Sequence, residues 1–303
     1  WPVLAELARS ARARVRGEML ILLSEGDIAG PEEVRSLCRA RLSDVDSEVR
    51  RAALVALRRL CDLDDQDFLN GAMGCLQDAD LAVRAQAIPP LIQSGDFFYQ
   101  VAAIEALNEL LKSTEAERRV VGVRVLGGLD DVRLIRTLVE YLTDQEGDVR
   151  VQAAEAVAYL SALPMPEWLR PWASQAAEKM RHDSIERVRL AGVTTWGNVG
   201  GREARVGLLS ALTDDSHHVR EVVASKLQAL GTSVLPDLEA ALVEADGDVR
   251  RQEALSIILA RVKRAQFAPL IEAYIEDNLR AGHETRGMLA ALDPHSSYLD
   301  PSA

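Results

Sequence analysis

The stretch DVDSEVRRAALVAL, at residues 44–57, decides the fold because its pattern returns along the chain. A Val-Arg pair stands at its centre, an acidic residue precedes the Arg by six positions, and apolar residues follow it at positions +3 and +7. Positions three, four and seven apart lie on one face of an α-helix. The stretch therefore predicts a polar turn followed by an amphipathic helix that begins near the Arg.

The same pattern occurs seven times, at steps of 30–39 residues, with Arg118 in place of the Val in the third unit. The Arg column consists of Arg50, Arg84, Arg119, Arg150, Arg189, Arg220 and Arg250. The acidic column consists of Asp44, Asp78, Asp144, Asp183 and Asp214, with Ser113 and Glu244 in the same register. A Leu stands eight positions before the Arg in six of the seven units and closes a preceding helix. Each unit is thus predicted to be a pair of antiparallel helices, and a period in this range is typical of helical solenoids, whose pairs bury their apolar faces by stacking.

The Arg column needs a physical explanation of its own. A cation in the first turn of a helix opposes the helix macrodipole by ~0.3–1 kcal/mol. We therefore expect the Arg and Asp columns to pair as a ladder of charge-assisted hydrogen bonds between successive units. We predict that these charges are structural; the alternative is a row of ligand-binding arginines.

The pattern D-x-D-x-x-V-R-x-x-A-x-x-A-L at residues 44–57 resembles the HEAT repeat, especially its short bacterial form found in phycobilin-lyase-like proteins. The resemblance covers the chain from about Glu32 to Val262. It implies an all-α fold, a right-handed, armadillo-like α-solenoid of about seven helical hairpins with helical caps. HEAT arrays serve as scaffolds, adaptors and regulatory domains and, less often, as enzymes.

We expect three parts along the chain. Residues 1–31 form an N-terminal capping helix and loop, with one amphipathic helix from Val3 to Leu23, and residues 32–265 form the solenoid. Residues 266–303 form C-terminal capping helices and a frayed tail. Pro89 and Pro90 lack backbone donors, so we expect the helix around them to kink or break before Leu91.

A Pro-rich and Trp-rich insertion interrupts the array near residues 161–173. Its Trp168 and Trp172 either pack the insertion onto the scaffold or form a ridge that binds a partner, because aromatic residues do both. Arg124 and Glu155 stand in the exposed columns of their helices and are further candidates for contact with a partner. The concave face, lined by the second helix of each pair, is the expected docking surface.

Composition excludes several kinds of partner. The chain has 35 basic and 47 acidic residues, a net charge of −12, which disfavours nucleic acids, a base-flipping glycosylase activity and anionic membranes. Three cysteines without a C-x-x-C pair predict neither a disulfide framework nor a zinc site. The longest apolar run has five residues, so we expect no direct membrane insertion and a cytoplasmic location. A protein or peptide partner remains the expectation.

Catalytic chemistry has little support in the residues. The HEAT-type diiron hydroxylases use repeated His-Glu pairs, whereas this chain has only His283-Glu284, and His217-His218 is expected to be a solvated turn. No cysteine or serine stands in a nucleophile motif. We therefore predict no cofactor, no metal and a non-catalytic scaffold for protein–protein interaction or regulation.

Two alternative functions follow from resemblance. Residues 275–294 resemble the segment after HEAT arrays fused to bacterial membrane transporters, and the chain begins at Trp1, so it could be a soluble appendage of such a transporter. The likeness to phycobilin lyases implies, as the second alternative, an enzyme that handles a chromophore.

Overall fold

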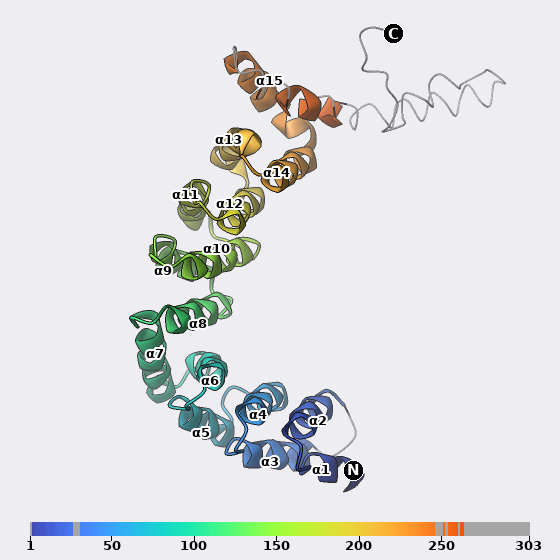
Figure 1. Ribbon diagram of the computed structural model, residues 1–303, viewed down its shortest axis with the longest axis vertical. Coiled ribbons are helices and arrows are strands. Elements are labelled where there is room, and N and C mark those ends of the chain that lie inside the picture. Colours follow the sequence, from blue (N-terminus) through green and yellow to red (C-terminus); the bar gives the residue numbers. More distant parts are fainter. Residues whose placement is uncertain (1, 27–30, 246–250, 252–253, 260, 264–303) are drawn as a thin grey trace, which may run out of the picture. The chain divides into compact units, whose positions relative to one another are not determined.

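The computed structural model describes residues 2–26, 31–245, 251, 254–259 and 261–263, and every structural statement concerns these residues. They form helices and turns without any strand, in hairpins that follow one another as an all-α solenoid (Figure 1). The chain divides into two compact units, residues 1–169 and 170–303, and each is described by itself. Among the described helices, none has both the length and the apolarity that a bilayer crossing requires.

The first unit consists of five helical hairpins in its described part. Their helices are α1 (Pro2–Leu7) and α2 (Ala13–Glu25), α3 (Pro31–Arg41) and α4 (Ser47–Leu60), α5 (Gln66–Cys75) and α6 (Leu81–Gln93), α7 (Phe97–Leu111) and α8 (Ala116–Gly127), and α9 (Ile135–Tyr141) and α10 (Gly147–Ser161). The second helices α2, α4, α6, α8 and α10 pack on one another in that order. Short 3-10 turns at Val132–Leu134 and Glu167–Leu169 precede α9 and end the unit.

The second unit continues the same architecture. Its helices are α11 (Arg170–Met180) and α12 (Glu186–Val199), α13 (Gly201–Ser210) and α14 (His217–Ala229), and α15 (Leu235–Glu244). Helix α12 packs on α14, and α13 contacts both α11 and α15. The core of this unit is one apolar cluster that includes Trp196, Leu208 and Leu227.

Polar turn residues cap some of the second helices, namely α4, α6 and α14, whereas α2, α8, α10 and α12 have no side-chain cap. The side chain of Asp46 accepts hydrogen bonds from the backbone N–H groups of Glu48 and Val49, and Asp80 caps α6 in the same way. Such caps satisfy helix N–H groups that have no partner inside the helix.

The apolar columns of the repeat form the cores. In six units the residue seven positions after the Arg is at most 4% exposed; these residues are Leu57, Leu91, Leu126, Val157, Trp196 and Leu227. In the seventh unit this position is Ile257, which is 47% exposed. The +3 column is small where helices approach closely: a Cβ atom on Gly192 would lie 3.0 Å from the carbonyl oxygen of Ala177 on α11. The +3 and +7 columns therefore mark the buried faces of the second helices.

The structure corrects two local expectations, the single N-terminal helix and the break of the helix at Pro89 and Pro90. Residues 2–25 form two helices, α1 and α2, and not one helix from Val3 to Leu23, because the residues Ser10 to Arg12 form a turn. Helix α6 runs without interruption through Pro89 and Pro90. Pro90 and Leu91 are buried there, and we attribute the continuity to this packing, which compensates the lost backbone donors.

Some expectations fall outside the described residues. These are the C-terminal caps and tail at residues 266–303, the domain boundary at residue 265, and Arg250. The stretch at 164–166 is irregular and separates α10 from the 3-10 turn before α11, in the place of the expected insertion.

Candidate functional site

Among the described residues, bidentate Arg–Asp pairs connect successive hairpins, and we call each of these pairs a rung. In every rung Nε and Nη2 of the Arg donate to the two carboxylate oxygens of an Asp in the following hairpin, at 2.6–3.1 Å. The rungs are Arg16–Asp44, Arg50–Asp78, Arg119–Asp144 and Arg189–Asp214. Their side chains are only 5–16% exposed. Each rung is thus a bidentate, nearly buried ion pair between two hairpins.

The arginines of the rungs, and three further arginines in the same register of the repeat, also donate hydrogen bonds to the turn before their own helix. Each donates to the carbonyl oxygen six residues earlier, from Nη1 in all but Arg84, which uses Nε. The arginines that do so are Arg16, Arg50, Arg84, Arg119, Arg150, Arg189 and Arg220. Carbonyl and carboxylate oxygens together therefore surround a cation that would otherwise oppose the helix macrodipole.

The Asp of a rung has a second task. Oδ1 of Asp78 accepts a hydrogen bond from the backbone N–H of Asp80, which closes the turn before α6. The hydrogen bonds from Arg50 hold the pKa of Asp78 below its ordinary value. Ser113 closes the equivalent turn through its Oγ but offers no carboxylate to Arg84. One rung of the pattern is therefore missing between the hairpins α5–α6 and α7–α8.

Other predicted ladder residues make part of this pattern. Arg150 donates to the carbonyl oxygens of Asp144 and Gln145, and Arg220 donates to those of Asp214 and Asp215. Asp183 accepts from the backbone N–H of Ile185 and so closes its turn.

The sequence analysis missed the rung of Arg16, because it began the Arg column at Arg50. Val15 precedes Arg16, Ser10 stands six residues before it, and Arg50 follows 34 residues later. The register of the repeat therefore extends to α1 and α2, and this register was the available signal.

The predicted partner-binding residues have different surroundings. Trp168 is 55% exposed in the first unit, and Trp172 is 39% exposed in the second. Arg124 on α8 is exposed, and its Nε donates to Oε1 of Gln152 on α10 at 3.2 Å. Glu155 on α10 is half-buried and is also engaged in an interaction. Both tryptophans thus keep a substantial part of their surface open to solvent.

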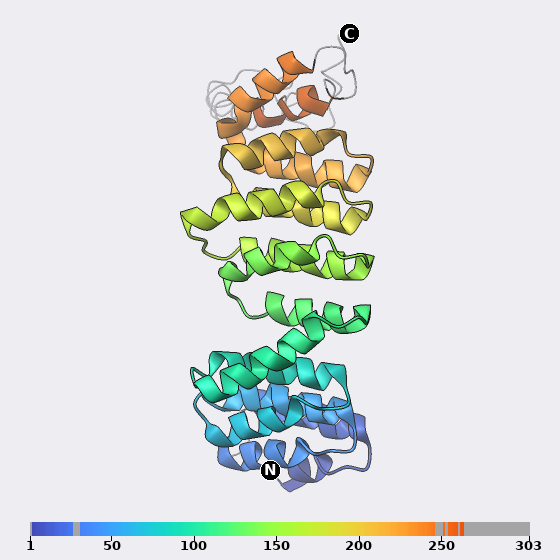
Figure 2. The same cartoon turned by 90° about the vertical axis from the view of Figure 1, so that its left-hand side faces the viewer.

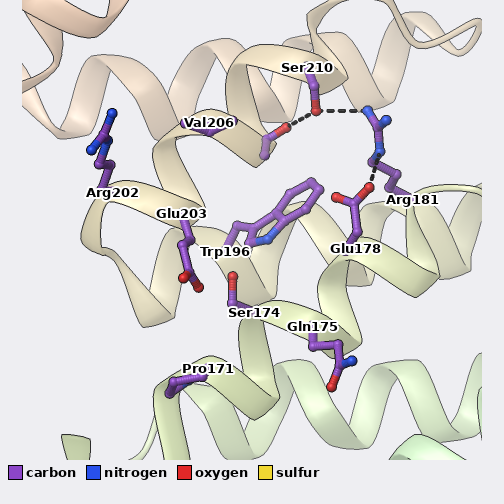
Figure 3. Close-up of a pocket in the computed structure, with 11 residues that line it drawn as sticks. Pro171, Ser174, Gln175, Glu178, Arg181, Trp196, Arg202, Glu203, Val206 and Ser210 are labelled. Atoms are coloured by element: carbon purple, nitrogen blue, oxygen red, sulfur yellow. Dashed lines mark hydrogen bonds and ion pairs between the residues drawn. The ribbon is translucent and has the colours of Figure 1, made fainter.

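A groove of about 690 Å³ lies between the first helices α11 and α13, with the indole of Trp196 as its floor (Figure 3). Gly207 allows this arrangement, because a Cβ atom there would lie 2.3 Å from Cε2 of Trp196. Arg181 donates to Oγ of Ser210 at 2.7 Å and to Oε1 of Glu178 at 3.1 Å. The hydroxyl groups of Ser174 and Ser210 and the carboxylates of Glu178 and Glu203 line the groove, whereas no His or Cys lines it.

A second groove, of about 880 Å³, lies between the second helices α2 and α4. Leu22, which is 54% exposed, is its most open apolar side chain. The charges on its rim pair within their own helices, Arg14 with Glu18 and Arg51 with Glu48. This groove is therefore an apolar depression on the second helices.

A cluster of exposed apolar side chains belongs to a first helix, α7. Phe97 is 79% exposed, Phe98 65%, Val101 36% and Ile104 47%, and we call these four residues the α7 stripe. The opposite face of the helix is fixed by packing, and Tyr99 donates its hydroxyl group to side-chain oxygens of Gln66 and Asn70 at 2.9 Å. Figure 2 looks onto the first helices and shows α7 with no described helix in front of it. A helix that is apolar on both faces exposes a surface suited to a partner.

The cysteines and histidines form no reactive arrangement among the described residues. Burial raises the pKa of Cys38 and of Cys61 to about 12, and that of Cys75 to about 11. Such thiols are protonated at neutral pH and are poor nucleophiles. In the described part of the chain, no group of three or more His, Cys, Asp or Glu residues is placed to hold a metal ion.

Comparisons with known proteins agree with this architecture. A family profile for HEAT repeats matches residues 173–258. No curated protein sequence matches the chain. Among solved structures, Escherichia coli YibA is 20% identical with a TM-score of 0.50, over 87% of this chain and 92% of that protein.

Two further structures are similar. Kap95p, solved in a study of its binding to RanGDP, is 14% identical with a TM-score of 0.51, over 89% of this chain and 42% of Kap95p. The CpcE–CpcF phycocyanin lyase from Nostoc sp. PCC7120 is 15% identical over 86% of this chain and 93% of the matched chain, but its TM-score of 0.41 is too low to support an argument. YibA and Kap95p therefore support the fold alone. The repeat pattern, the stacked hairpins and the family match together identify residues 173–258 as HEAT repeats, and the described hairpins before them have the same architecture.

Proposed function

We propose that this HEAT-repeat chain is a non-catalytic scaffold for protein–protein interaction or regulation, and that a protein partner docks on its exposed helix faces. One observation carries the proposal: the α7 stripe presents two phenylalanines, a valine and an isoleucine to solvent on a regular helix. Exposed apolar surface of this kind is a mark of interaction sites. Kap95p, which shares the fold, binds RanGDP, and this supports the same class of function.

The ladder has a structural role in this proposal. Its guanidinium groups are occupied by carbonyl and carboxylate oxygens, as Arg189 shows even though it borders a polar hollow of about 540 Å³. We extend this role to Arg150 and Asp183, which follow the same register. The arginines are then unavailable to an outside ligand and set the spacing of the helices that a partner meets.

The partner-binding residues predicted from sequence belong to the same proposal. Trp168 and Trp172 expose large apolar surfaces, and Arg124 contributes a charged group at the surface of α8. A cytoplasmic location fits the three free, buried thiols, because reducing compartments keep such groups unpaired.

The test is retention of a protein partner by the full chain. Tagged wild-type chain serves as bait in a lysate of its source cells, beside a Phe97→Ser, Phe98→Ser double variant and a Leu22→Ser control. We expect a stoichiometric protein on the wild-type chain and on the control, and its loss from the double variant, with helix content unchanged by circular dichroism. A chromophore or a metal that copurifies, detected by absorbance or elemental analysis, would instead support an enzyme.

A further inference from the structure

We propose that the α7 stripe binds a basic amphipathic helix, an inference that rests on the interaction function proposed above. Phe97, Val101 and Ile104 are spaced four and three residues apart, so they lie along one face of α7 over two turns. With Phe98 beside them, their exposed surface is on the order of 400 Å². That is about the size of the largest apolar patch on a typical monomer, which is often functional.

The charge next to the stripe selects the partner. The 15 residues of α7 include two carboxylates, Glu105 and Glu109, and no cation. Both carboxylates are exposed, four residues apart on the side of the stripe where Phe98 lies, and neither makes an ion pair with another described residue. Asp96 at the N-cap adds a third negative charge, and Lys112 follows only after the last turn. A partner that covers the stripe therefore gains from Lys or Arg along one flank.

The surface is also rigid enough to recognise a helix. Tyr99 is 4% exposed and hydrogen-bonded to α5, and Ala103, Leu107 and Leu110 are buried on the same inner face. The helix is thus held before a partner arrives, which lowers the ordering cost of binding. At 1.5 Å per residue α7 offers a track of about 22 Å, and a straight helix of similar length matches its periodicity.

Other occupants fit less well. A second copy of the chain would bring the same acidic flank, because its own α7 has no cation that could pair with Glu105 and Glu109. Nucleic acids and anionic membranes carry charge of the same sign as this flank. A basic helix is the one occupant that satisfies both the apolar stripe and its carboxylates.

The experiment measures binding of two labelled synthetic peptides to the full chain by fluorescence anisotropy. Each peptide has about 15 residues with Leu at helical spacing, the length of α7. One carries Lys along one flank, and the matched control carries Glu at the same positions. The proteins compared are the wild-type chain, Phe98→Ser, the double variant Glu105→Gln, Glu109→Gln, and Leu22→Ser in the groove between α2 and α4.

We expect the Lys peptide to bind the wild-type chain at least about tenfold more tightly than the Glu peptide. Phe98→Ser should weaken the Lys peptide about tenfold. The double Gln variant should weaken it severalfold and reduce the salt dependence of binding, because rim charges act through screened electrostatics. Leu22→Ser should leave the affinity unchanged.

The proposal is overturned if the two peptides bind equally, if neither binds, or if Leu22→Ser and not Phe98→Ser removes binding. It is also overturned if the chain itself dimerises through this face, seen as a sedimentation change that Phe98→Ser abolishes. Failure here is distinguishable from failure of the scaffold function. A protein partner that the lysate experiment shows to depend on Phe97 and Phe98 would support the scaffold while excluding a basic helix as its binding element.

Discussion

Substitution of Asp78 by Asn removes one charge from a rung and leaves the shape of the side chain intact. Arg50 donates to both oxygens of Asp78, at 2.6 and 2.7 Å, and the two side chains are only 15% and 10% exposed. The new amide keeps an acceptor for the backbone N–H of Asp80 but turns its NH₂ group toward the guanidinium. Breaking a fully buried pair costs about 3–5 kcal/mol, and hydrogen bonds to charged groups contribute about 1.5–3 kcal/mol. Because Arg50 retains some access to water, we expect a loss of about 2–3 kcal/mol.

The assay is urea unfolding followed by helix circular dichroism, with hydrogen exchange to locate the loss. Exchange should accelerate in α4 and α6, which the rung connects. The control is Glu18→Gln, which breaks the exposed pair with Arg14 and should leave the stability nearly unchanged, because water screens exposed pairs. If Asp78→Asn proves as mild as this control, the rungs do not stabilise the stack and the reasoning fails.

Three further predictions concern the same interior. Ser113→Asp should stabilise the chain by about 1 kcal/mol in urea unfolding by completing the missing rung with Arg84, and an unchanged or lower stability would contradict the pairing. The pKa of Asp78 is lower in the folded chain than in the unfolded chain, so its contribution to the stability of the fold is fully present above the ordinary Asp pKa and is lost as the pH falls below it. Stability measured during an acid titration should therefore decline below about pH 5. Because burial raises the pKa of Cys38 and Cys61 to about 12, iodoacetamide at pH 8 should alkylate them only as fast as the chain opens, and rapid labelling of the native chain would refute their burial.

Much of the fold follows from local periodicity. The residues at +3 and +7 mark the buried faces of the second helices α4, α6, α8, α10, α12 and α14, because helical geometry brings these positions to one side. The columns correctly separate core positions such as Leu57 and Trp196 from the turns. The confirmed fold class, an all-α solenoid, needed no information beyond this pattern.

Other features could not be predicted from the pattern. A proline inside a helix removes a backbone donor, so the local sequence predicts a break at Pro89 and Pro90. Helix α6 nevertheless continues through them, beside buried side chains that the local sequence does not reveal. The stacking of the hairpins decides which hairpin supplies the Asp partner of each Arg. The repeat pattern alone does not show that the carboxylate of Asp78 pairs with Arg50 and not with Arg84.

The candidate docking surface was missed for a related reason. Sequence reasoning expected contact on the second helices, whereas the α7 stripe lies on a first helix, outside the columns that define the repeat. Phe97 and Phe98 are apolar, and only the packing of Tyr99 against α5 reveals that they face solvent.

One paired measurement tests the central claim, that the ladder stabilises the stack while the α7 stripe binds the partner. It compares the stability and the retained partner of Asp144→Asn and Phe98→Ser with those of the wild-type chain, at a temperature where all three are folded. The account predicts that Asp144→Asn lowers stability and keeps the partner, whereas Phe98→Ser keeps stability and loses the partner. Loss of the partner in a folded Asp144→Asn chain, with full retention by Phe98→Ser, would contradict it and would assign binding to the arginine ladder.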